Sequence, residues 1–412
     1  MPGTTISANE QVARAHEAET TQTELFDAIT RLFGWLERNA YRGYDTFDGL
    51  SAKFVRSWTF ENKFLLIALQ QGVRRFPINL RPFFGIEKEY SSKAMGFFAR
   101  GFLRLFEATD NPLWSERARS CLQWLMDHPS AGYSGACWGN HFDYVSRSGR
   151  IPKGLPSVVW TSLIGHAFLD AYELLREDQY LQVAQSACEH IVRDLTLYSR
   201  EGSACIGYTP GGPSWVHNSN TLGASLLARA SFYGKNERYG DLARKAIMYT
   251  AQHQRSDGSW FYGEKPNLHW VDNFHTGYVL DCFKHYSDGT GDKSYDGILQ
   301  RGYEFWKSNF FLSDGTPKYY DNKTLPLDIQ CASQAIDTLA FFSERDPEAL
   351  QLALKVARWT IRNMQDGSGY FYYRRYSTPW VNKTPTLHWG QATMLCALGG
   401  LYRNIGNRKR SS

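Results

Sequence analysis

One stretch of the sequence gathers the side chains that acid–base chemistry needs. Asp272, Asn273, His275 and Tyr278 lie within seven positions, just after Trp270. The apolar run that follows is typical of a helix, so these groups are expected at a helix N-terminus, where free backbone N–H groups can hold a polar ligand. Asp272 and His275 share one face of that helix start. They are candidates for an acid–base pair; the structural alternative is a capping aspartate hydrogen-bonded to the histidine.

Polar and aromatic residues recur just before the other expected helices. Asparagine can bind hydroxyl groups or neutralise a carboxylate, and tyrosine can supply a phenolic base or a stacking surface; helix capping and aromatic packing are the structural alternatives. The candidate catalytic residues are Asp272, His275, Tyr278, Tyr320 and Asp328. The candidate substrate-binding residues are Asp45, Asp48, Trp138, Asn140, His141, Asp143, Trp160, His217, Asn218, Asn220, Trp270, Asn273, Gln330, His388, Trp389 and Gln391.

The elements that must position these residues form a repeat. A charged helix is followed by a loop rich in glycine and aromatic residues, and then by a helix rich in Gly, Ala and Ser. The small-residue helices begin near positions 93, 162, 220, 275, 333 and 391. The charged helices are expected at 112–127, 178–195, 237–254, 293–310 and 346–364, and a first amphipathic helix at 21–40.

A period near 55 to 58 residues, with one helix pair in each unit, indicates an array of supersecondary units. Small residues allow the second helices to pack closely in an inner ring, and charged residues suit a solvated outer ring. We expect six pairs to close into an all-α toroid; an open solenoid of helix pairs is the alternative.

The loops repeat as well. Asp257-Gly258, Asp314-Gly315 and Asp366-Gly367 each mark a turn before an aromatic run that suits a short strand. Every loop then returns to a small-residue helix. We therefore expect all units to deliver their polar and aromatic residues to one end of the ring, where they would line a wide, shallow cup.

Composition limits the function classes. Hydrophobic residues make up 42% of the chain and aromatic residues 15%, with 13 Trp and 24 Tyr, which favours surfaces that stack on ring-shaped ligands. The net charge of +5 is spread along the chain, so it is compatible with an anionic substrate but does not indicate nucleic acid. The seven cysteines contain no C-x-x-C pair and are expected to be buried free thiols.

Repeat period, helix character and loop pattern resemble the six-hairpin toroids, the (α/α)6 superfamily of glycoside hydrolases, polysaccharide lyases and sugar epimerases. The resemblance covers about residues 21 to 405. We expect a single toroid domain over 21–406, an N-terminal tail over 1–20 that is disordered or frayed, and a basic C-terminal tail over 407–412.

Two short sequence motifs resemble those of particular groups of toroid proteins. The run from Gln254 to Trp260 is similar to the repeated Gln-Trp motif of terpene-cyclase toroids, but the Asp-x-Asp-Asp acid motif of squalene-type cyclases is absent. Residues 137–143 and 270–278 resemble strings of toroid proteins associated with bacterial polysaccharide production, which implies a substrate class.

Four functions remain open. The first is an enzyme on a polysaccharide or oligosaccharide, with a uronate favoured, that abstracts a proton for epimerisation or β-elimination. The second is a glycoside hydrolase using two carboxyl groups, Asp272 and Asp328, with Asp143 and Asp48 as further candidates. The third is a non-catalytic glycan-binding or polysaccharide-assembly protein, and the fourth a terpene-cyclase-like toroid.

No cofactor is expected. No H-x-x-x-H or H-E-x-x-H spacing indicates a metal site, and G-x-S-x-G and P-loop motifs are absent. The sequence shows no apolar run of membrane-spanning length and no secretory h-region, which predicts a cytoplasmic location. The partner is expected to be a saccharide, without nucleic acid; the oligomeric state is not predicted.

Overall fold

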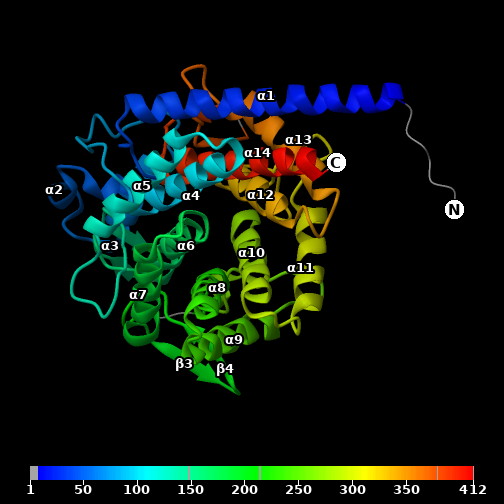
Figure 1. Ribbon diagram of the computed structural model, residues 1–412. Coiled ribbons are helices and arrows are strands. Elements are labelled where there is room, and N and C mark those ends of the chain that lie inside the picture. The colour runs from blue at the N-terminus through cyan, green and yellow to red at the C-terminus, as the bar shows by residue number, and fades with distance from the viewer. Residues whose placement is uncertain (1–7, 147–148, 213–214, 378, 412) are drawn as a thin grey trace.

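Two concentric rings of helices make up most of the structure, a computed structural model that describes residues 8–146, 149–212, 215–377 and 379–411 (Figure 1). For residues 8–19, 56 and 407–411 it describes the backbone alone. The inner ring contains α4 (Ser92–Thr109), α6 (Val158–Leu175), α8 (His217–Gly234), α10 (Asn273–Thr290), α12 (Ile329–Phe342) and α14 (Thr393–Ser411). The outer ring contains α1 (Ala8–Arg38), α5 (Pro112–Asp127), α7 (Asp178–Asp194), α9 (Glu237–Gln252), α11 (Asp296–Asn309) and α13 (Ala349–Met364).

The ring closes. Each inner helix packs on the next, from α4 through α6, α8, α10 and α12 to α14, and α14 packs back on α4. The first outer helix, α1, packs on α14, so that the two ends of the chain complete the sixth pair. The predicted (α/α)6 toroid is therefore confirmed, and the open solenoid is excluded.

Small residues allow this closure. Gly101 of α4 lies against the backbone of α14, where an added Cβ would come within 3.0 Å of the Cys396 nitrogen. Gly165 of α6 faces Leu226 of α8, where an added Cβ would come within 2.5 Å of a leucine methyl carbon. The glycine content of the inner helices thus sets how closely their axes approach.

The first and last helices extend into the segments that the sequence assigns to tails. Helix α1 begins at Ala8, thirteen residues before the predicted start, and α14 continues to Ser411. The sequence from Ala8 to Thr20 is rich in Ala and Glu, which have high helix propensity, but it lacks the apolar periodicity on which the helix prediction relied. Residues 1–7 and 412 lie outside the described residues.

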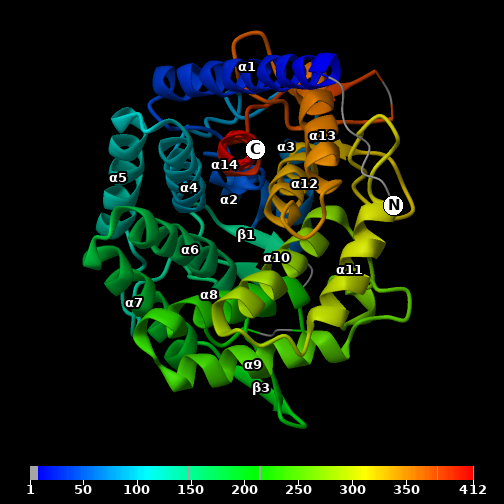
Figure 2. The same cartoon turned by 45° about the vertical axis from the view of Figure 1, so that its right-hand side comes forward.

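A segment between α1 and α4 covers the end of the ring at which the inner helices begin. It contains η1 (Asp48–Ser51), α2 (Val55–Thr59) and α3 (Lys63–Arg75). Figure 2 views the ring from the opposite end, with the carboxyl end of α14 in front and α2, α3 and β1 behind. Gln70 of α3 exchanges two hydrogen bonds with the backbone of Val145, each 3.0 Å, which fixes the segment to the ring.

Strands are short and lie in the loops. The pairs are β1 (Tyr144–Ser146) with β2 (Gly149–Ile151), β3 (Leu197–Arg200) with β4 (Ser203–Ile206), and β6 (Arg374–Arg375) with both β5 (Leu327–Asp328) and β7 (Val381–Asn382), all antiparallel. The Asp-Gly turns at 314–315 and 366–367 close single bridges, Phe311 with Pro317 and Gln365 with Phe371, so they do not form the predicted strands. Two further short helices are η2 (Pro266–Leu268) and η3 (Leu387–Ala392).

The core fills the space between the two rings. All seven cysteines are buried and unpaired, as predicted. No described helix is both long enough and apolar enough to cross a membrane.

Candidate functional site

The predicted acid–base pair forms at the start of α10. Asp272 is the N-cap: its Oδ1 accepts the backbone N–H of His275 at 3.0 Å, and its Oδ2 accepts Nδ1–H of His275 at 2.7 Å. Nε1–H of Trp270 donates to the same Oδ2 at 2.9 Å, and the Asp272 backbone bridges to Tyr320. Asn273 donates to the Lys318 carbonyl at 3.0 Å. The carboxylate is buried and fully hydrogen-bonded, so these contacts also satisfy the capping alternative.

A second group of predicted residues meets where the segment after α1 contacts the segment before α14. Nδ1 of His388 is hydrogen-bonded to Asp45, both fully buried, and the rings of Trp160 and Trp389 lie 5.6 and 5.8 Å from that of His388. Burial lowers the pKa of His141, partly offset by the Asp45 carboxylate. The pairing joins residues 343 positions apart in the sequence.

Buried arginines neutralise two further predicted carboxylates. Arg81 Nε donates to Asp48 at 2.7 Å, and Arg374 Nε donates to Asp328 at 2.8 Å. Burial raises the pKa of Asp48 to about 6 although Arg81 opposes this shift.

The remaining candidates are spread over other contacts. His217 pairs with Glu264 at 2.6 Å, and Asn220 and Gln391 bind backbone groups. Trp138 donates to the Leu125 carbonyl at 3.0 Å, and Gln330 donates to the Tyr278 hydroxyl at 3.0 Å. Asn140 and Asn218 keep a buried side-chain oxygen without a partner among the described residues, and Asp143 pairs with Arg150 near the surface.

This end of the ring therefore holds many of the predicted residues close together, but as packed side chains and not as an open cup. A cavity of about 10 Å³ lies beside Asp272, His275 and His217. Such a volume accommodates about one water molecule, so a sugar ring does not fit there. The expectation of an open cup fails because the segment carrying η1, α2 and α3 covers this end.

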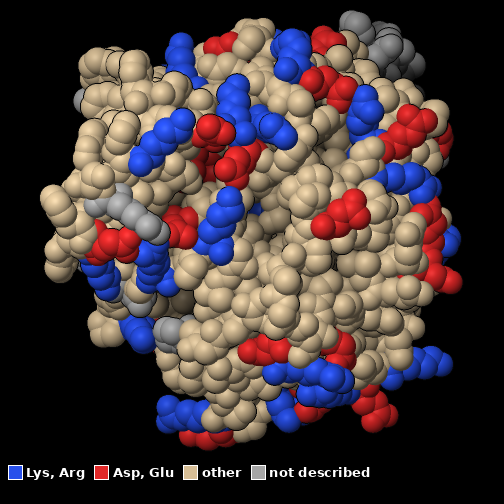
Figure 3. Space-filling model, turned by 90° about the vertical axis from the view of Figure 1, so that its left-hand side faces the viewer, with Lys and Arg blue, Asp and Glu red and all other residues tan. Residues whose placement is uncertain are grey.

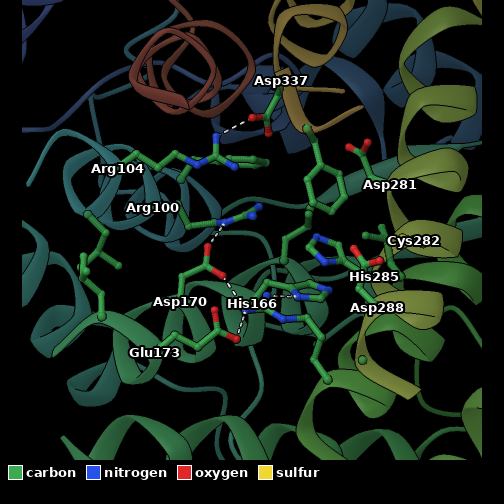
Figure 4. Close-up of a pocket in the computed structure, with 18 of the residues that line it drawn as sticks. Arg100, Arg104, His166, Asp170, Glu173, Asp281, Cys282, His285, Asp288 and Asp337 are labelled. Carbon is green, nitrogen blue, oxygen red and sulfur yellow. Dashed lines mark hydrogen bonds and ion pairs between the residues drawn. The ribbon is translucent and has the colours of Figure 1, made fainter. Parts of the chain in front are cut away.

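The large cavity lies in the other half of the ring. It has a volume of about 510 Å³, within the range of about 300–1,000 Å³ typical of small-molecule sites, and side chains from all six inner helices line it. Figure 4 draws 18 of these lining residues around one space and labels ten of them. Of the candidates from the sequence, only Tyr278 is among the described residues that line it.

A network of arginines and carboxylates forms one wall. Arg100 Nε donates to Asp170 at 2.7 Å, and Arg229 Nη2 donates to both Asp170 and Glu173 at 2.8 Å. Burial opposes the ionisation of Asp170, but the two guanidinium groups outweigh it and hold the pKa of Asp170 well below its ordinary value. Arg104 pairs with Asp337 on the neighbouring wall (Figure 4).

Two histidines in the cavity differ in their hydrogen bonds. An arginine can only donate, so Nδ1 of His166, 2.8 Å from Arg229 Nη1, must accept. The proton of His166 is therefore on Nε2, which donates to Ser225 Oγ at 2.9 Å. Neither ring nitrogen of His285 has a hydrogen-bond partner among the described residues. Burial and the neighbouring His166, Arg229 and Arg100 lower the pKa of His285 well below its ordinary value, so its imidazole is neutral.

Asp281 lies one helical turn before His285. Its Oδ2 accepts hydrogen bonds from Gln334 Nε2 at 2.7 Å and from Thr338 Oγ1 at 3.1 Å, whereas its buried Oδ1 has no partner among the described residues. Burial and the nearby Asp337 carboxylate raise the pKa of Asp281 well above its ordinary value. The raised pKa favours the protonated form of this side chain. The cavity thus places on one helix a base whose neutral form is favoured and an acid whose protonated form is favoured.

Sequence reasoning missed these residues because it searched the loops. A signal was present: charged and imidazole side chains recur three or four positions apart on the small-residue helices, which otherwise carry few charges. The residues are Arg100, Arg104, His166, Asp170, Glu173, Asp281, His285, Asp288 and Asp337.

Solved structures with the same architecture confirm the fold. Cellobiose 2-epimerase from Bacillus thermoamylovorans is 11% identical, with a TM-score of 0.59 over 76% of this chain and 90% of that one. A family 76 α-mannanase from Bacteroides thetaiotaomicron is 13% identical, with a TM-score of 0.57 over 77% and 86%.

An unsaturated glucuronyl hydrolase specific for heparin is 12% identical, with a TM-score of 0.57 over 77% and 86% of the two chains. The sequence matches no protein-family model and no curated protein. The chain therefore has the (α/α)6 toroid fold that its repeats predict.

Proposed function

We propose that this protein is a carbohydrate-active enzyme that binds a neutral reducing sugar in the central cavity and moves a proton on the carbon next to its carbonyl group. The observation that carries the proposal is the pair on α10: an unpartnered neutral imidazole, His285, one turn from a protonated carboxyl group, Asp281. Environments that push two pKa values in opposite directions assign one group as base and the other as acid.

The chemistry follows from these protonation states. His285 removes the proton from C2 of the open-chain sugar while Asp281 donates its Oδ1 proton to the carbonyl oxygen, giving a neutral enediol. Return of the proton from the His285 imidazolium to the other face of C2, while the O1 hydroxyl gives its proton back to the Asp281 carboxylate, yields the epimer. Protonation at C1, while the O2 hydroxyl gives its proton to Asp281, yields the ketose. Tyr278, whose hydroxyl accepts from Gln330, forms part of the cavity wall beside the acid.

The charges of the cavity favour a neutral sugar over the uronate suggested by the sequence. Arg100, Arg104 and Arg229 are each paired with a protein carboxylate, which leaves no unbalanced cation for a substrate carboxylate. Paired guanidinium and carboxylate groups still offer donors and acceptors to sugar hydroxyl groups. The structural likeness to an epimerase of cellobiose, a neutral disaccharide, supports the same substrate class.

Glycoside hydrolysis is the second candidate, and one observation favours it. Asp281 is protonated in part because Asp337 is close and negatively charged, and a protonated and an ionised carboxyl group are what hydrolysis requires. However, Arg104 holds Asp337 in an ion pair, which makes it a weak nucleophile.

Incubation with reducing sugars in deuterated water separates the candidates. We expect deuterium at C2 and a new epimer or ketose in the NMR spectrum for at least one neutral mono- or disaccharide, with at least a hundredfold loss in His285→Gln and Asp281→Asn. New reducing ends without deuterium incorporation would indicate the hydrolase. Unsaturated products from uronate glycans would indicate a lyase, and binding of glycans without turnover a non-catalytic protein.

A further inference from the structure

An unusual apolar surface lies on the segment that covers the far end of the ring. Eight large apolar side chains between positions 54 and 83 are exposed, more than in the rest of the described chain together. They are Phe54, Trp58, Phe60, Phe64, Leu65, Phe76, Ile78 and Phe83. We call this set the α2–α3 patch.

The exposure is a consequence of the fold of α3. Leu66, Gln70 and Val73, at i, i+4 and i+7, are its buried positions. Leu66 packs with Leu50 and Val145, and Val73 packs with Ala52 and Ile86. Phe64 and Leu65 lie on its other side and are 79% and 46% exposed. Apolar side chains normally occur on the buried face of an amphipathic helix, so the exposed Phe64 and Leu65 lack a covering partner among the described residues.

The turn before α3 carries a highly exposed aromatic ring. Phe60 and Glu61 have positive φ angles of 47° and 58°, and Phe60 is 82% exposed. Phe54 and Trp58 stack on each other 5.9 Å apart beside it. Aromatic rings at an exposed turn next to a short amphipathic helix are typical of segments that lie in a membrane interface.

The charges of the segment agree with that reading. Of the described side chains between positions 53 and 88, the exposed basic ones are Lys53, Lys63, Arg75 and Lys88 and the exposed acidic ones are Glu61 and Glu87. Arg81 is buried in an ion pair with Asp48 and does not contribute to this surface. Figure 3 views the side of the molecule on which α2 and α3 lie and shows uncharged surface interrupted by separate basic and acidic side chains. A protein partner with a matching apolar face does not require this excess of cations, whereas an anionic lipid surface does.

We propose that the α2–α3 patch docks the protein on a membrane surface containing anionic lipid, with the aromatic side chains among the lipid headgroups and the basic side chains at the phosphates. The patch lies at the end of the ring where the inner helices begin, whereas the residues that line the central cavity include Glu107, Leu174 and Gly289, near the carboxyl ends of α4, α6 and α10. The docked protein therefore presents its cavity to the aqueous phase. This inference does not depend on the reaction proposed above.

Sedimentation with sucrose-loaded vesicles tests the proposal on the full chain. We expect the protein to sediment with phosphatidylcholine vesicles that contain about one third phosphatidylglycerol, and much less with phosphatidylcholine alone or at high salt. The variant Trp58→Ser/Phe60→Ser/Phe64→Ser should lose at least tenfold in vesicle binding. Phe232→Ser is the matched control, because Phe232 is 65% exposed but lies on α8 at the cavity end.

Each other outcome overturns the proposal. A wild-type protein that stays in the supernatant, or a triple variant that binds as well as wild type, excludes membrane docking. A wild-type dimer in ultracentrifugation that the triple variant abolishes assigns the patch to a second copy of the chain. If the triple variant has a much lower melting temperature than wild type, the variant Lys53→Glu/Arg75→Glu replaces it in the vesicle-binding assay. In that case, hydrogen exchange of the wild-type protein with vesicles must also show protection confined to residues 54–83.

Discussion

The rings of His166 and His285 stack 5.0 Å apart at an interplanar angle of 24°, yet only His166 is hydrogen-bonded. Arg229 and Ser225 fix the tautomer of His166, while both nitrogens of His285 remain available to a ligand. In the proposed reaction the two adjacent imidazoles therefore have different roles: His166 is a positioning residue, and His285 is the base.

Substitution separates the two roles. His285→Gln should lower kcat of the proposed proton transfer by about 10²–10⁴, since a positioned base contributes that much, and should leave the thermal midpoint close to wild type. His166→Gln should lower kcat less and destabilise the fold, because it disturbs the Arg229 contact. Steady-state kinetics with thermal melts would measure both; equal activity losses in the two variants would contradict the assignment.

The activity should depend on pH in a bell-shaped manner. The lowered pKa of His285 keeps the base neutral until the pH falls well below that of an ordinary histidine. The raised pKa of Asp281 keeps the acid protonated until the pH rises well above that of an ordinary carboxyl group. A profile of kcat/KM should therefore fall on both sides, and Asp281→Asn, whose amide does not ionise, should lose the alkaline limb. Retention of that limb would assign it to another group.

Asp170 should stabilise the fold in a pH-dependent way. Its pKa is lower in the folded than in the unfolded chain, so its contribution is present above the unfolded value of about 4 and is lost as the pH falls toward the folded value. Asp170→Asn should cost about 3–5 kcal/mol at pH 7, because Arg100 and Arg229 remain buried beside it. Urea unfolding should show this difference shrinking in acid. Asp241→Asn, an exposed pair on α9, should change stability by less than about 1 kcal/mol.

Substitution of Asp272 and Asp328, the two carboxylates predicted from the sequence to be catalytic, should affect stability more than turnover. Asp272→Asn should destabilise by about 1–2 kcal/mol through the weakened cap, and Asp328→Asn by about 3–5 kcal/mol through the orphaned Arg374. If the central cavity is the active site, both variants should keep kcat within about tenfold of wild type wherever they remain folded. Loss of turnover in folded Asp272→Asn would support the catalytic role predicted from the sequence.

Replacement of two helical glycines, Gly101 and Gly72, by alanine should have opposite effects on stability, because only Gly101 lies at a close contact between inner helices. Gly101→Ala forces α4 away from α14, since the new methyl group would meet backbone atoms at 3.0 to 3.1 Å. Gly72→Ala on α3 meets no atom within 4 Å and should stabilise by about 0.5–1 kcal/mol through helix propensity. Denaturation should rank Gly101→Ala at least about 2 kcal/mol below Gly72→Ala. Similar stabilities would mean that the helices can separate without cost.

The sequence by itself determined the ring. Periodicity and residue size are local properties, so the alternation of charged and small-residue helices was sufficient to predict six pairs and their closure. Local spacing was also sufficient for the Asp272–His275 pair, because a cap involves residues three positions apart.

Only the tertiary structure decided which end of the ring is open. The sequence does not show that the segment of η1, α2 and α3 folds back over the starts of the inner helices, since that placement depends on contacts between distant residues such as Asp45 and His388. Nor does it show which face of each inner helix points to the axis. That rotation, set by packing around the whole ring, brings Asp281, His285 and the paired arginines into one cavity.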